Sequence, residues 1–279
     1  MSKIGVIAGG GQFPILFAEA AHKKGCQVFM AAHKGESSPE VEDIADEICW
    51  VKLGQLGKII KFFRQEGVTE AVLLGTITKT RIFRDIMPDF KGLTLWNRIK
   101  VRQDDSILRA VAEVLEDEGI KILESTVYLD ELLFPKGLLT KRKPSTEQID
   151  DIHFGWQMAR EIGRLDIGQC VVVRDRAVLA VEAIEGTDAA ILRGGKLAKE
   201  QAVVVKVKKP GQDFRFGLPA IGTKTIESME SVGASVLAVE TGQALLFDNV
   251  AVIERANKAG IVVVGVEEIN PGELDLGIN

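Results

Sequence analysis

The chain has 279 residues, with 35 Lys and Arg against 40 Asp and Glu, for a net charge of −5. This length suits one large domain or two modest ones. Dedicated nucleic-acid-binding proteins usually carry a basic excess, so the acidic balance disfavours that class. It does not exclude a nucleotide ligand, which needs only a local pocket. The 28 glycines predict many tight turns or places where the backbone lies close to a ligand.

The cysteines and the apolar runs indicate the cellular compartment. Cys26, Cys49 and Cys170 are widely spaced and odd in number, and they form neither a CxxC pair nor a disulfide framework. We therefore expect three reduced thiols in a cytoplasmic protein. No run approaches 18 apolar residues, so the sequence predicts no transmembrane helix.

The first half of the chain alternates short apolar runs with helical patterns. An apolar run over 4–8 meets Gly9-Gly10-Gly11, and a helix over 15–24 and a strand at about 27–32 follow. This order of strand, glycine loop, helix and strand is typical of a doubly wound α/β fold. Asp105 or Ser106 is the expected N-cap of a later helix. The further elements expected in this half are helices over 57–65 and 107–115 and strands over 71–74 and 120–123.

A polar stretch that contains Pro, Gly and a basic cluster interrupts the pattern after about residue 131. We predict an α/β protein with a Rossmann-like N-terminal domain over 1–131. A linker or hinge over 132–150 leads to a distinct C-terminal catalytic domain, α/β or α+β, over 151–279. The second half is expected to contain helices over 151–162, 223–232 and 249–259 and strands over 169–173, 177–182, 203–207, 235–239, 245–247 and 261–266.

Two loops of the first half are candidates for phosphate binding. Backbone N–H groups at a helix N-terminus bind anions, and glycine lets the backbone approach them closely. The first loop lacks the third glycine of the dinucleotide fingerprint, and His33 stands near the position of the expected acidic residue, which disfavours NAD. The second loop, Gly75 to Arg81, follows a strand and carries hydroxyl and cationic groups that suit a diphosphate. A tight turn and a solvated polar loop are the respective alternatives.

Two features of the second half could carry chemistry. Glu182, Glu185 and Asp188 lie within seven residues and could hold a hard cation such as Mg²⁺. Their alternatives are an exposed strand face and, for Asp188, a helix N-cap. The loop over 208–222 is long and dense in Gly, Pro and charge, which often indicates function. Its alternative is a surface connection with Phe214 and Phe216 as core anchors.

Several blocks along the chain resemble one known family. The blocks are 4–11 with Pro14, Gly57-Lys58, Met87-Pro88-Asp89 with Gly92-Leu93, 160–169, 180–188 and 218–222. In collinear order over nearly the whole chain, they resemble the UDP-2,3-diacylglucosamine pyrophosphatase of lipid A biosynthesis, in its form unrelated to calcineurin-like phosphoesterases. The blocks 165–169 and 182–188 are the most specific parts of this resemblance.

The resemblance implies a two-domain cytoplasmic enzyme of a Gram-negative bacterium that holds its substrate between the domains. The implied reaction is Mg²⁺-dependent hydrolysis of UDP-2,3-diacylglucosamine. Water attacks the α-phosphorus and gives UMP and 2,3-diacylglucosamine 1-phosphate (lipid X). The expected substrate-binding residues are Gly10, Gly11, Gln12, Gly75, Thr76, Lys79, Gln169, Thr187 and Lys209. The expected metal ligands are Asp188, Glu185 and Asp213.

One position departs from the family pattern. Where the family carries an Asp immediately before Leu-Pro-x-Ile-Gly, this sequence has Gly217. The resemblance assigns that Asp to the catalytic centre, and glycine can neither bind Mg²⁺ nor accept a proton. Either the enzyme is impaired but retains its ligand, or Asp213 or Asp188 takes over part of the role. A catalytically silent nucleotide-lipid-binding protein is therefore the alternative to an active pyrophosphatase.

A lipid substrate carries further expectations about partners. We expect transient contact with the inner-membrane face and no nucleic-acid partner, with a homodimer as an alternative to a monomer. The apolar residues between 83 and 96 are predicted to contribute to acyl-chain binding or to the domain interface. An ordinary core segment is the alternative for that stretch.

Overall fold

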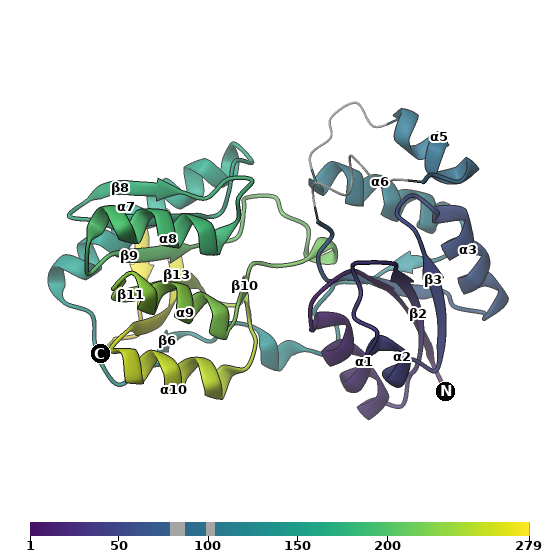
Figure 1. Cartoon of the computed structure of the whole chain (residues 1–279), viewed down its shortest axis with the longest axis horizontal. Helices are drawn as coiled ribbons and strands as arrows, with labels where there is room; N and C mark the ends of the chain where they lie inside the picture. The colour runs from purple at the N-terminus through teal and green to yellow at the C-terminus, as the bar shows by residue number, and fades with distance from the viewer. Residues whose placement is uncertain (79–86, 99–103, 279) are drawn as a thin grey trace. The chain divides into compact units, whose positions relative to one another are not determined.

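The computed structural model describes residues 1–78, 87–98 and 104–278. The chain divides into two compact units, shown in Figure 1. The first unit contains Met1–Asp130 together with Asp213–Gly217, and the second contains Glu131–Gln212 and Leu218–Asn279. Among the described residues, no helix combines the length and the apolar character needed to cross a membrane.

The first unit is built on a five-stranded parallel sheet in the order β3-β2-β1-β4-β5. The carboxyl ends of its strands therefore share one edge of the sheet. Its strands are β1 (Lys3–Ala8), β2 (Gln27–His33), β3 (Glu47–Val51), β4 (Glu70–Leu74) and β5 (Lys121–Ile122). Its helices are α1 (Phe13–Lys23), α2 (Val41–Ile44), α3 (Leu56–Gln65), α5 (Phe90–Arg98) and α6 (Asp104–Asp117).

Apolar side chains on alternate strand positions form the core of this unit. Ile7 of β1 and Phe29 of β2 pack in one cluster with Phe63 of α3 and Leu115 of α6. Leu95 of α5 belongs to the same cluster, so this part of the segment between 83 and 96 is ordinary core. Helix α1 contacts β1 and β2, and α2 packs beside it.

A short segment from the second half of the chain completes the first unit. The 3₁₀ helix η2 (Phe214–Phe216) is held by Ser125, whose backbone N–H and hydroxyl both donate to the Phe214 carbonyl at 3.0 and 2.8 Å. Phe216 packs against the core of the first unit. The interpretation of these phenylalanines as anchors therefore describes Phe216 well.

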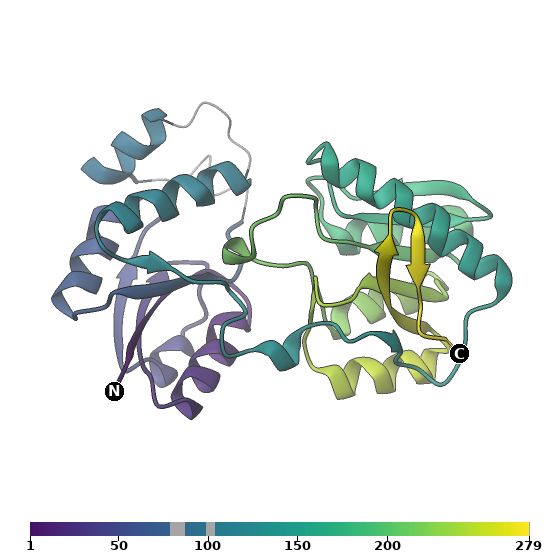
Figure 2. The same ribbon diagram turned by 180° about the vertical axis from the view of Figure 1, so that it is seen from behind.

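The second unit contains a larger mixed sheet, with the path β14-β13-β11-β9-β7-β8 and with β6 paired to β13. β9, β11 and β13 run parallel, whereas β7 lies antiparallel to β9 and β8. The strands of the second unit are β6 (Gly137–Leu138), β7 (Cys170–Arg174), β8 (Ala177–Val181), β9 (Val203–Lys206), β10 (Ala220–Ile221), β11 (Val236–Glu240), β12 (Leu245–Leu246), β13 (Val262–Asn270) and β14 (Glu273–Asp275), of which β10 and β12 form a separate two-stranded parallel sheet. The hairpin of β13 and β14 is yellow in Figure 2.

Helices cover both faces of this sheet. Val171 and Val173 of β7 pack with Trp156 on one side, while Cys170 and Val172 pack with Ile191 on the other. This alternation follows from the two-residue period of a strand. The helices are α7 (Thr146–Arg164) on the first face and α8 (Thr187–Ala198), α9 (Thr223–Ser231) and α10 (Asn249–Ala259) on the second.

The structure confirms a mixed α/β protein and corrects several local predictions. Helix α6 begins at Asp104, so neither Asp105 nor Ser106 is its N-cap. Asp188 lies in the first turn of α8, whose N-cap is Gly186, so the N-cap interpretation of Asp188 was wrong. Besides the two 3₁₀ helices, η1 (Asp130–Leu132) and η2, the elements without a sequence prediction are β3, α2, α5, β6, α8, β10 and β14. The segment predicted as a linker contains β6 and the first turn of α7.

Candidate functional site

In the first unit, the two loops predicted to bind phosphate pair with each other. The loop after β1 and the loop after β4 form an antiparallel bridge between Gly10 and Thr76. The Gly10 N–H donates to the Thr76 carbonyl at 2.7 Å, and the Thr76 N–H donates to the Gly10 carbonyl at 3.0 Å. The Gly10 N–H is therefore engaged within the protein.

Glycine is needed where these loops meet. A Cβ on Gly9 would lie 2.5 Å from the Thr76 carbonyl oxygen, and a Cβ on Gly75 would lie 2.5 Å from the Gly10 carbonyl oxygen. Both glycines therefore serve the close approach of two backbones. A Cβ on Gly11 would meet no atom within 4 Å, and the φ of 87° at this position is what favours glycine there.

A third loop, after β2, joins this edge of the sheet. His33 and Ser37 both bond the Ala8 carbonyl at the end of β1, at 2.9 Å from Nδ1 and 2.8 Å from Oγ. Because a carbonyl only accepts, Nδ1 carries the proton. Burial lowers the pKa of His33, so the ring is neutral at pH 7. The Glu36 carboxylate also accepts from the Thr78 hydroxyl at 3.0 Å, which ties this loop to the one after β4.

The remaining predicted ligand contacts of the first unit lie at the same edge or outside the described residues. Gln12 is the residue that precedes α1, and its carbonyl accepts the Ile15 and Leu16 N–H groups at 3.1 Å. Lys79 falls outside the part of the chain that the structure describes. Three loops at the carboxyl ends of β1, β2 and β4 thus form one continuous edge, at the place where parallel sheets bind ligands.

In the second unit, a buried carboxylate organises the start of α8. Glu182 is 7% exposed, and its two oxygens accept from the Thr187 hydroxyl at 2.8 Å and the Gln169 N–H at 3.3 Å. Oε1 of Gln169 is buried and has no hydrogen-bond partner in the structure. Two predicted substrate-binding residues are therefore brought together by Glu182. One of them presents a buried acceptor that a ligand donor could satisfy.

The other predicted polar residues of the second unit are in ion pairs. Lys209 Nζ lies 2.7 Å from Asp166 Oδ1, and Asp188 Oδ2 lies 3.5 Å from Lys224 Nζ. Glu185 contacts Arg193 at 2.6 Å. Its own backbone N–H and this guanidinium lower the pKa of Glu185.

A buried lysine supports the strand that follows position 217. Lys206 is only 4% exposed, and its ammonium donates to the Ala220 carbonyl of β10 at 2.9 Å. It pairs in register with Cys170 of β7. Burial and the nearby Glu182 carboxylate raise the pKa of Cys170, so this thiol stays protonated and unreactive.

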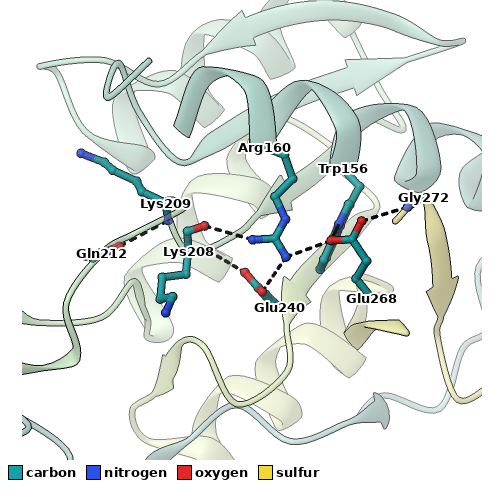
Figure 3. A network of polar contacts seen from close by, with 8 residues as sticks. All are labelled: Trp156, Arg160, Lys208, Lys209, Gln212, Glu240, Glu268 and Gly272. Atoms are coloured by element: carbon teal, nitrogen blue, oxygen red, sulfur yellow. Dashed lines mark hydrogen bonds and ion pairs between the residues drawn. The ribbon is translucent and has the colours of Figure 1, made fainter. Parts of the chain in front are cut away.

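Arg160 of α7 connects the carboxyl ends of the three parallel strands, as Figure 3 shows. Its Nη2 lies 2.7 Å from Glu240 at the end of β11 and 3.1 Å from Glu268 on β13. Its Nη1 donates to the Lys208 carbonyl, just after β9, at 3.3 Å. The Lys208 N–H donates back to Glu240 at 2.8 Å.

The same network stabilises ionised Glu268. Burial alone would raise its pKa, but the Gly272 N–H, the Trp156 indole N–H and Arg160 outweigh burial, and the pKa of Glu268 is lowered. The guanidinium carbon also lies 5.3 Å from the centre of the Trp156 ring, a cation–π distance. The network fixes the backbone at 208–209, where the loop that carries Asp213 and Gly217 begins.

Asp213 and Gly217 lie in the segment that packs on the first unit. The Arg215 guanidinium, 2.8 Å from Asp213 Oδ2, lowers the pKa of Asp213 despite the opposing effect of partial burial. Arg109 lies 3.3 Å from the same oxygen. Asp213 also accepts the Arg215 N–H as the cap of η2. Asp213 therefore has a clear structural role.

Gly217 has a backbone conformation that favours glycine. Its φ is 97° and its ψ is 149°, a region that other residues enter only at a cost. A Cβ at this position would meet no atom within 4 Å. Space is therefore available for a carboxylate, while the backbone would be strained.

Within each unit taken by itself, the residues that the structure describes do not form a ready magnesium site. Asp213 belongs to the first unit, whereas Glu185 and Asp188 belong to the second. Each carboxylate has a cationic partner. Over the described residues, no three His, Cys, Asp or Glu side chains gather in an arrangement that could hold a metal ion.

Comparisons with known proteins identify the family. Residues 3–132 match the LpxI N-terminal domain and residues 135–264 match the LpxI C-terminal domain. The chain is also 36% identical to the UDP-2,3-diacylglucosamine pyrophosphatase LpxI of Caulobacter vibrioides, over 96% of this chain and 98% of that protein. The chain belongs to the LpxI family. The resemblance found from the sequence blocks is confirmed.

Two solved structures resemble the chain only weakly. Phosphoribosylglycinamide synthetase from Anaerococcus prevotii is 13% identical over 62% of this chain and 32% of its own, with a TM-score of 0.26. The biotin carboxylase subunit of pyruvate carboxylase is 13% identical over 66% and 39%, with a TM-score of 0.27. Neither likeness carries an argument about fold or function.

For this member of the LpxI family, sequence reasoning missed the Arg160 network and Lys206. A usable signal existed for Glu240, because an acidic residue directly follows the buried run 236–239 at a strand's carboxyl end. Arg160 stands in the family block over 160–169 but looks like any charged residue on an amphipathic helix. Lys206 interrupts an apolar run, and such a buried lysine requires a specific partner.

Proposed function

We propose that this protein hydrolyses UDP-2,3-diacylglucosamine to UMP and 2,3-diacylglucosamine 1-phosphate (lipid X). The observation that carries the proposal is the match to both LpxI domains, in order, with 36% identity over 96% of the chain to the Caulobacter vibrioides enzyme. Water attacks the α-phosphorus, the bond to the bridging oxygen breaks, and the water oxygen remains on UMP. The protein is thus a hydrolase that acts on a diphosphate.

The test is UMP release from UDP-2,3-diacylglucosamine in ¹⁸O-labelled water. We expect the label in UMP and none in the sugar phosphate, because attack occurs on the α-phosphorus. Label in the sugar phosphate would overturn the site of attack. Intact substrate bound without any UMP release would favour the alternative, a catalytically silent nucleotide-lipid-binding protein.

Residues 1–131, which make up most of the first unit, are proposed to form a Rossmann-like nucleotide-binding domain. The parallel order β3-β2-β1-β4-β5 supports this, since strand order reverses between β1 and β4. The loops that carry Gly11, Gln12 and Thr76 meet at that point. The C-terminal domain over residues 151–279, which includes the segment 213–217 that packs with the first unit, is proposed to supply the catalytic groups. Gln169 and Thr187 would contact the substrate there, and Lys209 would contact it from the neighbouring loop.

Catalysis is proposed to depend on Mg²⁺. Mg²⁺ is often bound by one or two carboxylates together with substrate phosphates, so a site need not be complete before substrate arrives. When bound, the cation would neutralise the diphosphate charge. Asp188 and Glu185 are the proposed contributors in the second unit and Asp213 in the first. Turnover in excess EDTA should vanish and return with added Mg²⁺; full turnover in EDTA would contradict this dependence.

The substrate also suggests where the protein works. We propose a cytoplasmic enzyme that visits the inner-membrane face, because two acyl chains keep the substrate in a bilayer. The proposal includes no nucleic-acid partner, because a net charge of −5 disfavours binding to nucleic acid. A homodimer remains an alternative to a monomer, and the molar mass of the protein in solution would distinguish the two.

A further inference from the structure

The start of α5 presents an unusual group of exposed apolar side chains. Phe90 is 84% exposed, Met87 55% and Leu93 48%. An exposed phenylalanine beside two further large apolar residues is costly in water and indicates an interaction surface. The segment is anchored, because the Asp89 carboxylate accepts from the Gly92 N–H at 2.9 Å and from the Lys58 N–H of α3 at 3.1 Å.

Two lysines lie next to these apolar residues, and further cations line a cavity that one of the two lysines shares. Lys52 Nζ lies 3.3 Å from the Met87 sulfur, and Lys91 follows Phe90 directly. Lys91 also lines an open cavity of about 340 Å³ with Lys61, Arg64 and Glu118. This cavity has three cations and one carboxylate in its lining, and Glu118 contacts both Arg64, at 2.8 Å, and Lys91, at 2.5 Å.

We propose that Met87, Phe90, Leu93, Lys52, Lys61, Arg64 and Lys91, called the α5 surface, dock the protein on an anionic phospholipid bilayer. Apolar side chains flanked by cations are typical of helices that lie in the membrane interface. The apolar residues enter the acyl boundary, and the cations bind lipid phosphates. The proposal rests on the proposed function only in that a diacylated substrate must be taken from a membrane. It refines the sequence prediction for 83–96, of which 83 and 86 lie outside the described residues.

The experiment is sedimentation of the full chain with vesicles that contain no nucleotide lipid. Phosphatidylcholine vesicles with phosphatidylglycerol are compared with pure phosphatidylcholine vesicles. Wild type should bind the anionic vesicles, and binding should weaken with salt. Phe90→Ser with Leu93→Ser should lower partitioning about tenfold or more, and Lys91→Gln about fivefold. Val250→Ser, which changes a 72% exposed apolar residue on α10, serves as the matched control and should bind as wild type does.

Equal binding by wild type, the double variant and the control would overturn the proposal. A wild-type dimer that the double variant dissociates, without vesicle binding by either, would assign this surface to a second copy of the chain. Folding of each variant is checked by its unfolding transition, which these exposed positions should leave unchanged. UMP release from detergent-dispersed substrate is measured separately, so failure of the proposed function is distinguishable from failure of docking.

Discussion

In the first unit, the carboxyl ends of β1 and β4 meet through backbone groups, because Gly10 and Thr76 bond each other and glycine allows the approach. In the second unit, the carboxyl ends of β9, β11 and β13 meet through charged side chains centred on Arg160. Both arrangements fix loops at the edge where parallel sheets bind ligands. They differ in the kind of chemical group that each presents at this edge.

The backbone arrangement of the first unit fixes the positions of loop backbone groups and contains few titratable side chains. Backbone N–H groups in such loops suit the recognition of a phosphate-bearing ligand. The side-chain arrangement holds a guanidinium and two carboxylates at the start of the loop toward position 217. The first unit therefore offers backbone groups to a ligand, whereas the second unit fixes the start of the loop that carries position 217. Position 217 is informative because it packs with the first unit, although the residues before 213 and after 217 in the chain belong to the second unit.

The largest expected effect is on catalysis. It comes from a substitution that introduces a carboxylate at position 217, in the first unit. We expect Gly217→Asp to raise Mg²⁺-dependent UMP release on the order of 10²-fold or more, as gain of a catalytic group typically does. Gly217→Asn is the matched control, because it has nearly the same size and the same cost at a φ of 97° but no charge. Equal turnover by the Asp variant, the Asn variant and wild type would rule out a missing carboxylate as the cause of impairment.

The next effect is on stability and tests the charged arrangement of the second unit. Arg160→Met would leave Glu240, which is 8% exposed, without its cation. Breaking a fully buried pair costs about 3–5 kcal/mol, so for these partly buried groups we expect a loss of about 2–3 kcal/mol in the free energy of unfolding. Urea denaturation at pH 7 measures it.

The control for this variant lies one turn along the same helix. Arg164→Met breaks an exposed pair with Glu161 and should cost only about 0–0.5 kcal/mol. Equal losses for the two variants would contradict a special role for Arg160. The pKa of Glu268 is lowered from 4.5, so its contribution is present above pH 4.5 and is lost as the pH falls through the folded value. The stability difference between wild type and Arg160→Met should therefore shrink below pH 4.5.

The smallest effect tests the backbone arrangement of the first unit. Gly9→Ala would place a Cβ 2.5 Å from the Thr76 carbonyl oxygen, and such overpacking costs about 1–3 kcal/mol. Gly222→Ala has no neighbour within 4 Å and no strained φ, so it should cost less than about 1 kcal/mol as an N-cap change. Hydrogen exchange should show faster exchange in the first unit only. If Gly9→Ala lowered the free energy of unfolding no more than Gly222→Ala does, the close approach of the loops after β1 and β4 would not matter for stability.

Most buried elements could be predicted from the sequence because their apolar pattern is local. The predicted strand over 71–74 corresponds to β4, and the predicted helix over 249–259 matches α10. Helix α8 was missed because Gly194 and Gly195 weaken its helical pattern, although they lie buried against the sheet and against Val232 at the end of α9. Strand β3 was missed because the acidic stretch around it hides a short, half-buried run.

The sequence by itself determined the α/β class, the collinear family blocks and the departure at Gly217, since these depend on local pattern and residue identity. Only the tertiary structure decided which loops pair, which carboxylates are held by arginine, and that residues 213–217 pack with the first unit. The physical reason is that hydrogen bonds and ion pairs join residues far apart in the chain. Their partners depend on the spatial order of the strands, and neighbouring residues do not reveal that order.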